Sequence, residues 1–204
     1  MVSEIRIYIE GGGRDTRSRR LIREGFGQFL RPIYELAAAR GIKWSLIPSG
    51  SRNSAFENFA LGLRKHPDAF NVLLVDSETR VTRRRWEHLR QQDNWNIPSV
   101  PEEHCHLMAQ TVEAWILADP EALIAYYGRG LVRSALPKHS DIEAVAKVDL
   151  EKSLDRSTAK TQKGRYTKIR HCADLLALLN QDRVRKRARH CDLLFTTLEA
   201  KIRE

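Results

Sequence analysis

The amino-acid sequence predicts an α/β protein, in which a parallel β-sheet is flanked by helices and followed by a C-terminal helical region. Strand-like stretches alternate with helix-like spacing up to about residue 127, which is the pattern of βαβ units. The stretch Val72–Val75 is apolar without alternation, as expected of a parallel strand that is buried on both faces. Beyond Gly128 only helical patterns remain. We therefore expect an α/β domain over 1–127 and a helical extension over 128–204 that packs on it, with one single domain as the alternative.

The first part of the chain is expected to supply three strands and two helical segments. Apolar residues recur at helical spacing from about Thr16, and Pro32 is expected to kink or split that helix. The small-residue loop Pro48–Ser54 can cap a second, short helix. The expected strands of this part are Ile5–Ile9, Lys43–Ile47 and Asn71–Val75.

The rest of the chain is expected to add one strand and several helices. Trp86 and Leu89 lie in an arginine-rich helix, and a proline-containing loop over 93–103 separates it from the strand His104–Met108. Asp119 and Pro120 are a typical cap and first-turn residue of a helix. One further helix starts near Thr111, and three more are expected over Asp141–Ser157, Tyr166–Leu179 and Arg183–Ile202.

Composition and charge narrow the class of protein. The 204 residues include 35 Lys and Arg against 26 Asp and Glu, and the net charge of +9 suits a polyanionic partner such as nucleic acid. The apolar runs are too short for a membrane span, and the N-terminus lacks the apolar centre of a signal peptide. The three cysteines form no Cys-x-x-Cys pair. We therefore expect a cytoplasmic protein with reduced thiols and no membrane association.

Carboxylates follow two of the expected strands. Glu10 ends the first strand and precedes three glycines, while Asp76 and Glu78 follow Val75. Near the end of a strand, residues i and i+2 point the same way, and ligands of open α/β sheets bind beyond the carboxyl ends of strands. Carboxylate oxygens suit Mg²⁺, so we expect the three side chains to meet around one divalent metal ion. The alternative for the acidic pair alone is a helix cap, which is a frequent role of acidic residues after strands.

These residues resemble a known pattern. A Glu-Gly at the end of the first strand and a later acid-x-acid pair are similar to the Toprim signature of topoisomerases, primases and OLD nucleases. The chain also resembles the bacterial family DUF4276 over nearly its whole length, and it is similar to RloB-type proteins. The segments that carry this resemblance are Ile7–Gly13, Ser49–Arg52, Leu74–Glu78, His106–Met108, Glu113–Trp115, 134–137 and 163–176. One departure is that Glu78 stands where the pattern usually has Asp.

The resemblance implies a role for each acidic residue. Asp76 and Glu78 would hold Mg²⁺ or Mn²⁺, with Glu113 as an additional ligand. Glu10 would be a ligand or the general acid/base for phosphodiester cleavage. The alternative for Glu113 is a first-turn helix residue that the helix dipole favours.

Four further residues are candidates for binding nucleic acid or phosphate: Arg52, His106, Lys163 and Lys168. For Arg52 the alternative is a plain helix-capping loop. His104 and His106 have no second pair with zinc-site spacing, so a structural role is the alternative for both. The basic run Arg183–Arg189 is expected to be a solvated helix face.

Together these observations favour a metal-dependent nuclease that acts on DNA or RNA. The resemblance further implies the effector of an anti-phage defence system, with a partner ATPase of ABC or AAA type encoded nearby. The alternative is a non-catalytic Toprim-fold subunit that binds and is regulated by that ATPase. A third class, another phosphotransfer or dinucleotide-binding enzyme, fits poorly because Gly11, Gly13 and Thr16 do not make the Gly-x-Gly-x-x-Gly motif. The sequence leaves the oligomeric state open.

Overall fold

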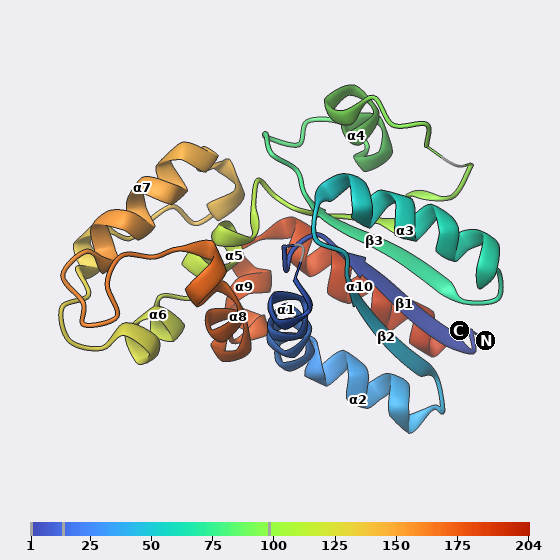
Figure 1. Ribbon diagram of the computed structural model, residues 1–204, viewed down its shortest axis with the longest axis horizontal. Helices are drawn as coiled ribbons and strands as arrows, with labels where there is room; N and C mark the ends of the chain where they lie inside the picture. Colours follow the sequence, from blue (N-terminus) through green and yellow to red (C-terminus); the bar gives the residue numbers. More distant parts are fainter. Residues whose placement is uncertain (1, 14, 98) are drawn as a thin grey trace.

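The sheet has four parallel strands in the order β2-β1-β3-β4 in the computed structural model, which describes residues 2–13, 15–97 and 99–204 (Figure 1). Ile9 at the end of β1 lies opposite Leu74 of β3 and Pro48 of β2, so the carboxyl ends of these strands share one edge. The strands are β1 (Glu4–Ile9), β2 (Lys43–Pro48), β3 (Phe70–Asp76) and β4 (Cys105–Met108). The predicted fold class is confirmed.

Helices cover both faces of the sheet (Figure 1). Side chains of β1 alternate, with Ile7 in the larger core and Tyr8 in the smaller one. Every residue of β3 is buried, which explains why its sequence shows no alternation. The smaller core lies under α3 (Arg52–Lys65) and α4 (Arg85–Asp93). The larger core lies under α1 (Thr16–Phe29), α2 (Arg31–Ala39), α5 (Val112–Ala118) and the C-terminal helices.

The C-terminal region is helical, as predicted from the sequence. Its α8 packs along α1, and its α10 packs on β4 and α2. Residues from both sides of position 127 contribute to the larger core, and the division of the chain at that position stays a prediction. The helices are α6 (Pro120–Tyr127), α7 (Lys147–Thr158), α8 (Lys168–Leu178), α9 (Gln181–Arg187) and α10 (Arg189–Arg203). Short 3₁₀ turns lie at Glu102–His104, Arg133–Ala135 and Ile142–Ala144.

The expected break at Pro32 is present, because α1 ends at Phe29 and Pro32 lies in the first turn of α2. The prediction of a single helix over Arg183–Ile202 is wrong. Two helices occupy this range, and they are separated at Ala188, whose backbone is extended. The helix expected from Asp141 begins only at Lys147.

The basic run of α9 is also not a merely solvated face. Arg185 forms ion pairs with Asp192 (2.7 Å) and Glu199 (2.8 Å). Arg183 lies 3.1 Å from the buried Asp119. Arg187 donates hydrogen bonds to four carbonyl oxygens, those of Leu117, Ala118, Pro137 and His139. These side chains tie α9 to the end of α5 and to the loop before α7.

Across the described residues, no helix combines the length and the apolar character that a membrane crossing requires. The cysteines Cys105, Cys172 and Cys191 are all buried and free.

Candidate metal centre

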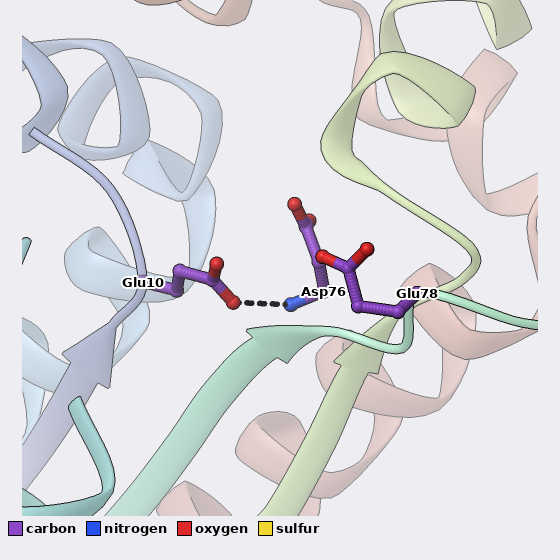
Figure 2. A group of neighbouring side chains, drawn as sticks. All are labelled: Glu10, Asp76 and Glu78. Atoms are coloured by element: carbon purple, nitrogen blue, oxygen red, sulfur yellow. Dashed lines mark hydrogen bonds between the residues drawn. The ribbon is translucent and has the colours of Figure 1, made fainter. Parts of the chain in front are cut away.

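Three carboxylates meet at the carboxyl edge of the sheet (Figure 2). Glu10 follows β1 directly, Asp76 is the last residue of β3, and Glu78 lies two residues further on. One oxygen from each of the three side chains lies within 4.8 Å of the others. Oε2 of Glu10 also accepts a hydrogen bond from the backbone N–H of Asp76 (3.0 Å), which fixes the spacing of the two strand ends. The structure thus brings together the three residues singled out from the sequence. We call them the acidic cluster.

The backbone at both strand ends adopts positive φ angles. Gly11, Gly12 and Gly13 have φ angles of 133°, 86° and 54°, which turn the chain sharply away from β1. A Cβ atom on Gly12 would lie 2.7 Å from the Cα of Arg19, so only glycine fits there. Glu78 also has a positive φ of 63°, which is unfavourable for a residue with a side chain. Its N–H donates to the carbonyl oxygen of Gln110 (2.8 Å), and this hydrogen bond holds the conformation.

Four helices begin beside the acidic cluster. The backbone N–H of Val112, the first residue of α5, donates to Oδ1 of Asp76 (2.9 Å). A helix N-terminus carries partial positive charge, so it stabilises a buried carboxylate. The first or second residues of these helices are Arg52 in α3, Glu113 in α5, Lys147 in α7 and Lys168 in α8.

Each carboxylate of the acidic cluster has its own cationic partner. The pairs are Lys168 Nζ with Asp76 Oδ2 (2.8 Å), Lys147 Nζ with Glu78 Oε2 (2.5 Å) and Arg52 Nη1 with Glu10 Oε2 (3.5 Å). The side chain of Lys168 is 48% exposed, whereas that of Asp76 is 2% exposed, so the ammonium group covers the carboxylate from the solvent side. Both lysines come from the helices of the C-terminal region, which therefore completes the site.

The guanidinium of Arg52 is held in place by several partners. It makes a two-pronged pair with Asp93 (2.6 and 2.8 Å), donates to the main-chain oxygen of Asp76 and lies 5.3 Å from the ring centre of Trp95. Its side chain is only 14% exposed. Arg52 therefore fixes the position of the acidic cluster, and phosphate binding by this residue stays a prediction.

Glu113 lies next to the acidic cluster rather than within it. Among the described residues, the carboxylates grouped within reach of one ion are those of Glu10, Asp76 and Glu78. Glu113 accepts hydrogen bonds from the hydroxyls of Thr111 and Tyr166 (2.9 Å for Tyr166) and lies 3.6 Å from Nζ of Lys168. Its carboxylate thus positions Lys168, and its expected role as a metal ligand stays a prediction.

Burial and mutual repulsion shift the pKa values of the acidic cluster. Burial, together with the nearby charge of Asp76, raises the pKa of Glu10 to about 7. Burial also raises the pKa of Asp76, against the opposing charge of Lys168. For Glu113, burial is outweighed by the charge of Lys168 and the hydrogen bond from Thr111, so its pKa is lowered. Glu10 can therefore gain or lose a proton near neutral pH.

The prediction that His106 binds phosphate is wrong. Its side chain is fully buried, its Nε2 contacts the carbonyl oxygen of Glu103 (3.1 Å), and burial lowers its pKa to about 3. Its strand neighbours Cys105 and Leu107 lie in the smaller core, so alternation turns His106 toward the opposite face and away from the strand end. Lys163 lies with its Nζ 4.5 Å from the ring centre of Tyr126, and its contact with nucleic acid stays a prediction.

Lys147 and Thr111 were not identified from the sequence. Lys147 follows an unremarkable loop 69 residues after Glu78, and only tertiary packing brings the two together. The sequence contained one weak indication of Thr111, namely its position two residues before Glu113, which was expected to be a metal ligand.

Comparison with known proteins gives one match. Residues 9–199 match the sequence model of a family described as Domain of unknown function (DUF4276). Searches of curated proteins and of solved structures found no match. Because the matching region covers most of the chain, this protein belongs to the DUF4276 family.

Proposed function

We propose that this protein is a metal-dependent nuclease that hydrolyses phosphodiester bonds of DNA or RNA with Mg²⁺ or Mn²⁺. The single observation that carries the proposal is the acidic cluster, whose oxygens from two neighbouring strand ends lie within 4.8 Å of one another. The proposed relationship to Toprim nucleases of OLD and RloB type rests on two motifs. These are a glutamate followed by glycines and, later in the chain, an acid-x-acid pair. The net charge of +9 agrees with a polyanionic substrate.

The acidic cluster has a suitable chemistry for such an ion. Magnesium takes oxygen ligands at about 2.1 Å, so oxygens that share one ion are closer together than the 4.8 Å limit that the acidic cluster meets. The three side chains would therefore have to move toward one another to hold one ion. Glu10, Asp76 and Glu78 would hold the ion. Bound Mg²⁺ or Mn²⁺ polarises the phosphoryl oxygen and lowers the pKa of a bound water.

The protein's own residues supply the remaining functions. Without a metal ion, Glu10 has a pKa of about 7, which suits proton transfer near neutral pH. A cation bound to its carboxylate would lower this pKa, so Glu10 would serve either as a ligand or as the general acid/base. A hollow of about 290 Å³ beside the acidic cluster is lined by Lys147 and Lys168, and also by the acids Glu113 and Glu151. The two lysines, which pair with Glu78 and Asp76, would neutralise the charge of a phosphate group only after a metal ion has taken over these carboxylates.

The biological setting rests on the family resemblance. We propose a cytoplasmic effector of an anti-phage defence system, activated or restrained by an ATPase of ABC or AAA type encoded nearby. The first-turn lysines of α7 and α8 would give such a partner direct control of the site, because any movement of these helices moves Lys147 and Lys168.

A cleavage assay tests the proposal. The protein, alone and with the neighbouring ATPase, is incubated with plasmid DNA and with total RNA in Mg²⁺ or Mn²⁺. Cleavage is expected for the unmodified chain and for Glu57→Gln, which alters an exposed acid on α3. Loss of cleavage is expected for Glu10→Gln and for Asp76→Asn. Cleavage at unchanged rates in both of these variants would sink the proposal.

A second function is favoured by the ion pairs of the acidic cluster. All three carboxylates already have cationic partners, so the site is electrostatically satisfied without a metal ion. This arrangement suits a non-catalytic Toprim-fold subunit that binds the ATPase and is regulated by it. Stable binding of the ATPase, with no cleavage in any of the conditions above, would favour the subunit over the nuclease.

A further inference from the structure

A mostly apolar cavity of about 360 Å³ lies beside the acidic cluster and is lined by residues of α1 and of the first half of α8. Its lining includes Glu10, which belongs to the acidic cluster, and Val112 and Lys168, which contact Asp76. Its apolar wall is formed by Leu21, Ile22 and Phe26 of α1 and by Ile169 and Cys172 of α8. Any ligand in this cavity would therefore lie directly against the proposed position of the phosphate.

The wall of this cavity is a fixed part of the fold. Helices α1 and α8 touch at Gly25 and Ala173, where a Cβ atom on Gly25 would lie 2.6 Å from the carbonyl oxygen of Ala173. Phe26 and Ala173 line the cavity beside this contact. Since the two helices cannot approach more closely at this contact, the backbone packing keeps the neighbouring wall of the cavity in place.

Ile169 lines the cavity and is 86% exposed as a residue, the highest value among the exposed large hydrophobic residues of the described chain. It follows Lys168 directly in the first turn of α8. An isoleucine in this position gains free energy when a ligand covers it, because apolar surface is then removed from water. A cation and an exposed apolar side chain thus stand next to each other beside the acidic cluster.

Another part of the lining, which we call the glycine rim, is polar. It consists of Gly11, Gly12, Gly13 and Gly50, with the side chains of Asp15 and Ser18 beside them. The N–H of Gly11 donates to the carbonyl oxygen of Gly50, whereas within the described part of the chain the N–H groups of Gly12 and Gly13 have no protein acceptor. The lining of the cavity therefore combines apolar walls with polar groups that can form hydrogen bonds.

We propose that this cavity holds a nucleobase of the substrate strand, next to the phosphate at the acidic cluster. A base has apolar faces and a hydrogen-bonding edge, and these match the walls and the glycine rim. This inference rests on the proposed function for the presence of a nucleic-acid strand. It deepens that function, because a base inside a duplex is paired and stacked, so the substrate is a single strand or carries an unpaired base.

Binding of small probes tests this inference without any cleavage. Adenosine 5′-monophosphate and thymidine 5′-monophosphate are compared with ribose 5-phosphate, which lacks a base, by titration calorimetry in Mg²⁺. Both nucleotides are expected to bind more tightly than ribose 5-phosphate by about tenfold or more, a difference of about 1.4 kcal/mol, because the cavity covers the base.

Variants locate the base. Ile169→Ser removes an exposed apolar contact, and Leu21→Trp fills the cavity from a partly exposed position of α1. Both are expected to reduce the preference for nucleotides by about fivefold or more. Leu178→Ser is the matched control, because Leu178 is also exposed on α8 but does not line the cavity. Circular dichroism confirms that each variant is folded.

Three results would overturn the inference: no binding of the nucleotides, equal affinity for ribose 5-phosphate, or a base preference that survives both Ile169→Ser and Leu21→Trp. The outcome is separable from that of the proposed function. Base-dependent binding without cleavage of any nucleic acid would support base binding in the cavity and contradict the proposed nuclease activity. Cleavage without base-dependent binding would support the nuclease activity and contradict base binding in the cavity.

Discussion

The acidic cluster and the arginine contacts of α9 place charged groups inside the same protein in different ways. Arg187 reaches the carbonyl oxygens of Leu117 and Ala118 at the end of α5, where backbone acceptors have no partner within the helix. Asp119 accepts hydrogen bonds from the N–H of Asn180 (2.9 Å) and from Arg183 (3.1 Å). At the α9 contacts, therefore, each charged group meets groups of opposite polarity.

In the acidic cluster each carboxylate also has a cationic partner, but here like charges face one another as well. The charge of Asp76 helps to raise the pKa of Glu10, although Arg52 and Lys168 lie close by. Repulsion between buried carboxylates destabilises the folded state, so packing alone does not explain such an arrangement. Buried charges with complementary partners therefore stabilise the fold, whereas carboxylates crowded together indicate a binding site.

The largest expected effect separates function from stability. Asp76→Asn is expected to reduce cleavage more than about a thousandfold, since a bound metal ion supplies several kcal/mol of transition-state stabilisation. The same change is expected to leave the free energy of unfolding within about 1 kcal/mol, because it removes a charge whose burial is unfavourable. Initial cleavage rates and urea unfolding measure the two quantities. A variant that is inactive only because it unfolds would contradict the comparison.

A change in the α9 contacts is expected to lower the stability of the protein. Arg187→Gln should lower the free energy of unfolding by about 2 kcal/mol, since four carbonyl oxygens, three of them in partly buried contacts, lose a charged donor. Lys186→Gln, its exposed neighbour on α9, is the control and is expected to have almost no effect. Thermal and urea unfolding check both variants. Equal stability of the two would show that Arg187 does not brace the fold.

Glu10→Gln is expected to stabilise the metal-free protein at pH 8, by about 1 kcal/mol. The folded-state pKa of Glu10 is about 7, above its ordinary value of 4.5. The folded state therefore holds a proton that the unfolded state has lost, and this contribution to stability rises as pH falls from above 7 toward 4.5. The difference in unfolding free energy between the two proteins, measured in EDTA from pH 8 to pH 5, is expected to shrink as pH falls. A constant difference would argue against the shifted pKa.

The smallest expected effect concerns Lys147→Met. The Lys147 and Glu78 side chains are 33% and 32% exposed, so their ion pair is screened and contributes less than about 1 kcal/mol to stability. The variant is nevertheless expected to weaken nucleic-acid binding, because it removes one of the two lysines of the hollow. Urea unfolding and fluorescence anisotropy with a labelled single strand measure the two effects. If the variant unfolded, Lys147 would be a residue that stabilises the fold, as Arg187 of α9 is expected to be.

The sequence was sufficient to predict the sheet and the meeting of Glu10, Asp76 and Glu78. Parallel strands end at a common edge, so carboxylates that follow neighbouring strands must lie near one another. The gap between α1 and α2 was also predictable, because Pro32 restricts the backbone locally. These successes depend on local patterns of the sequence.

The remaining features depend on tertiary packing. The pairing of Lys147 with Glu78 comes from the docking of α7, which no local pattern encodes. The direction of His106 could not be predicted, because both faces of β4 are buried and its sequence shows no alternation. The break at Ala188 involves neither glycine nor proline, and it accompanies the contacts of Arg187 with distant carbonyl groups.

Electron paramagnetic resonance of bound Mn²⁺ can show whether the acidic cluster holds one divalent cation. One Mn²⁺ per chain is expected in the unmodified protein and in Glu57→Gln. That Mn²⁺ is expected to be lost in Glu10→Gln and in Asp76→Asn. If the unmodified protein binds no Mn²⁺, or if both cluster variants bind it unchanged, the acidic cluster is not a metal site.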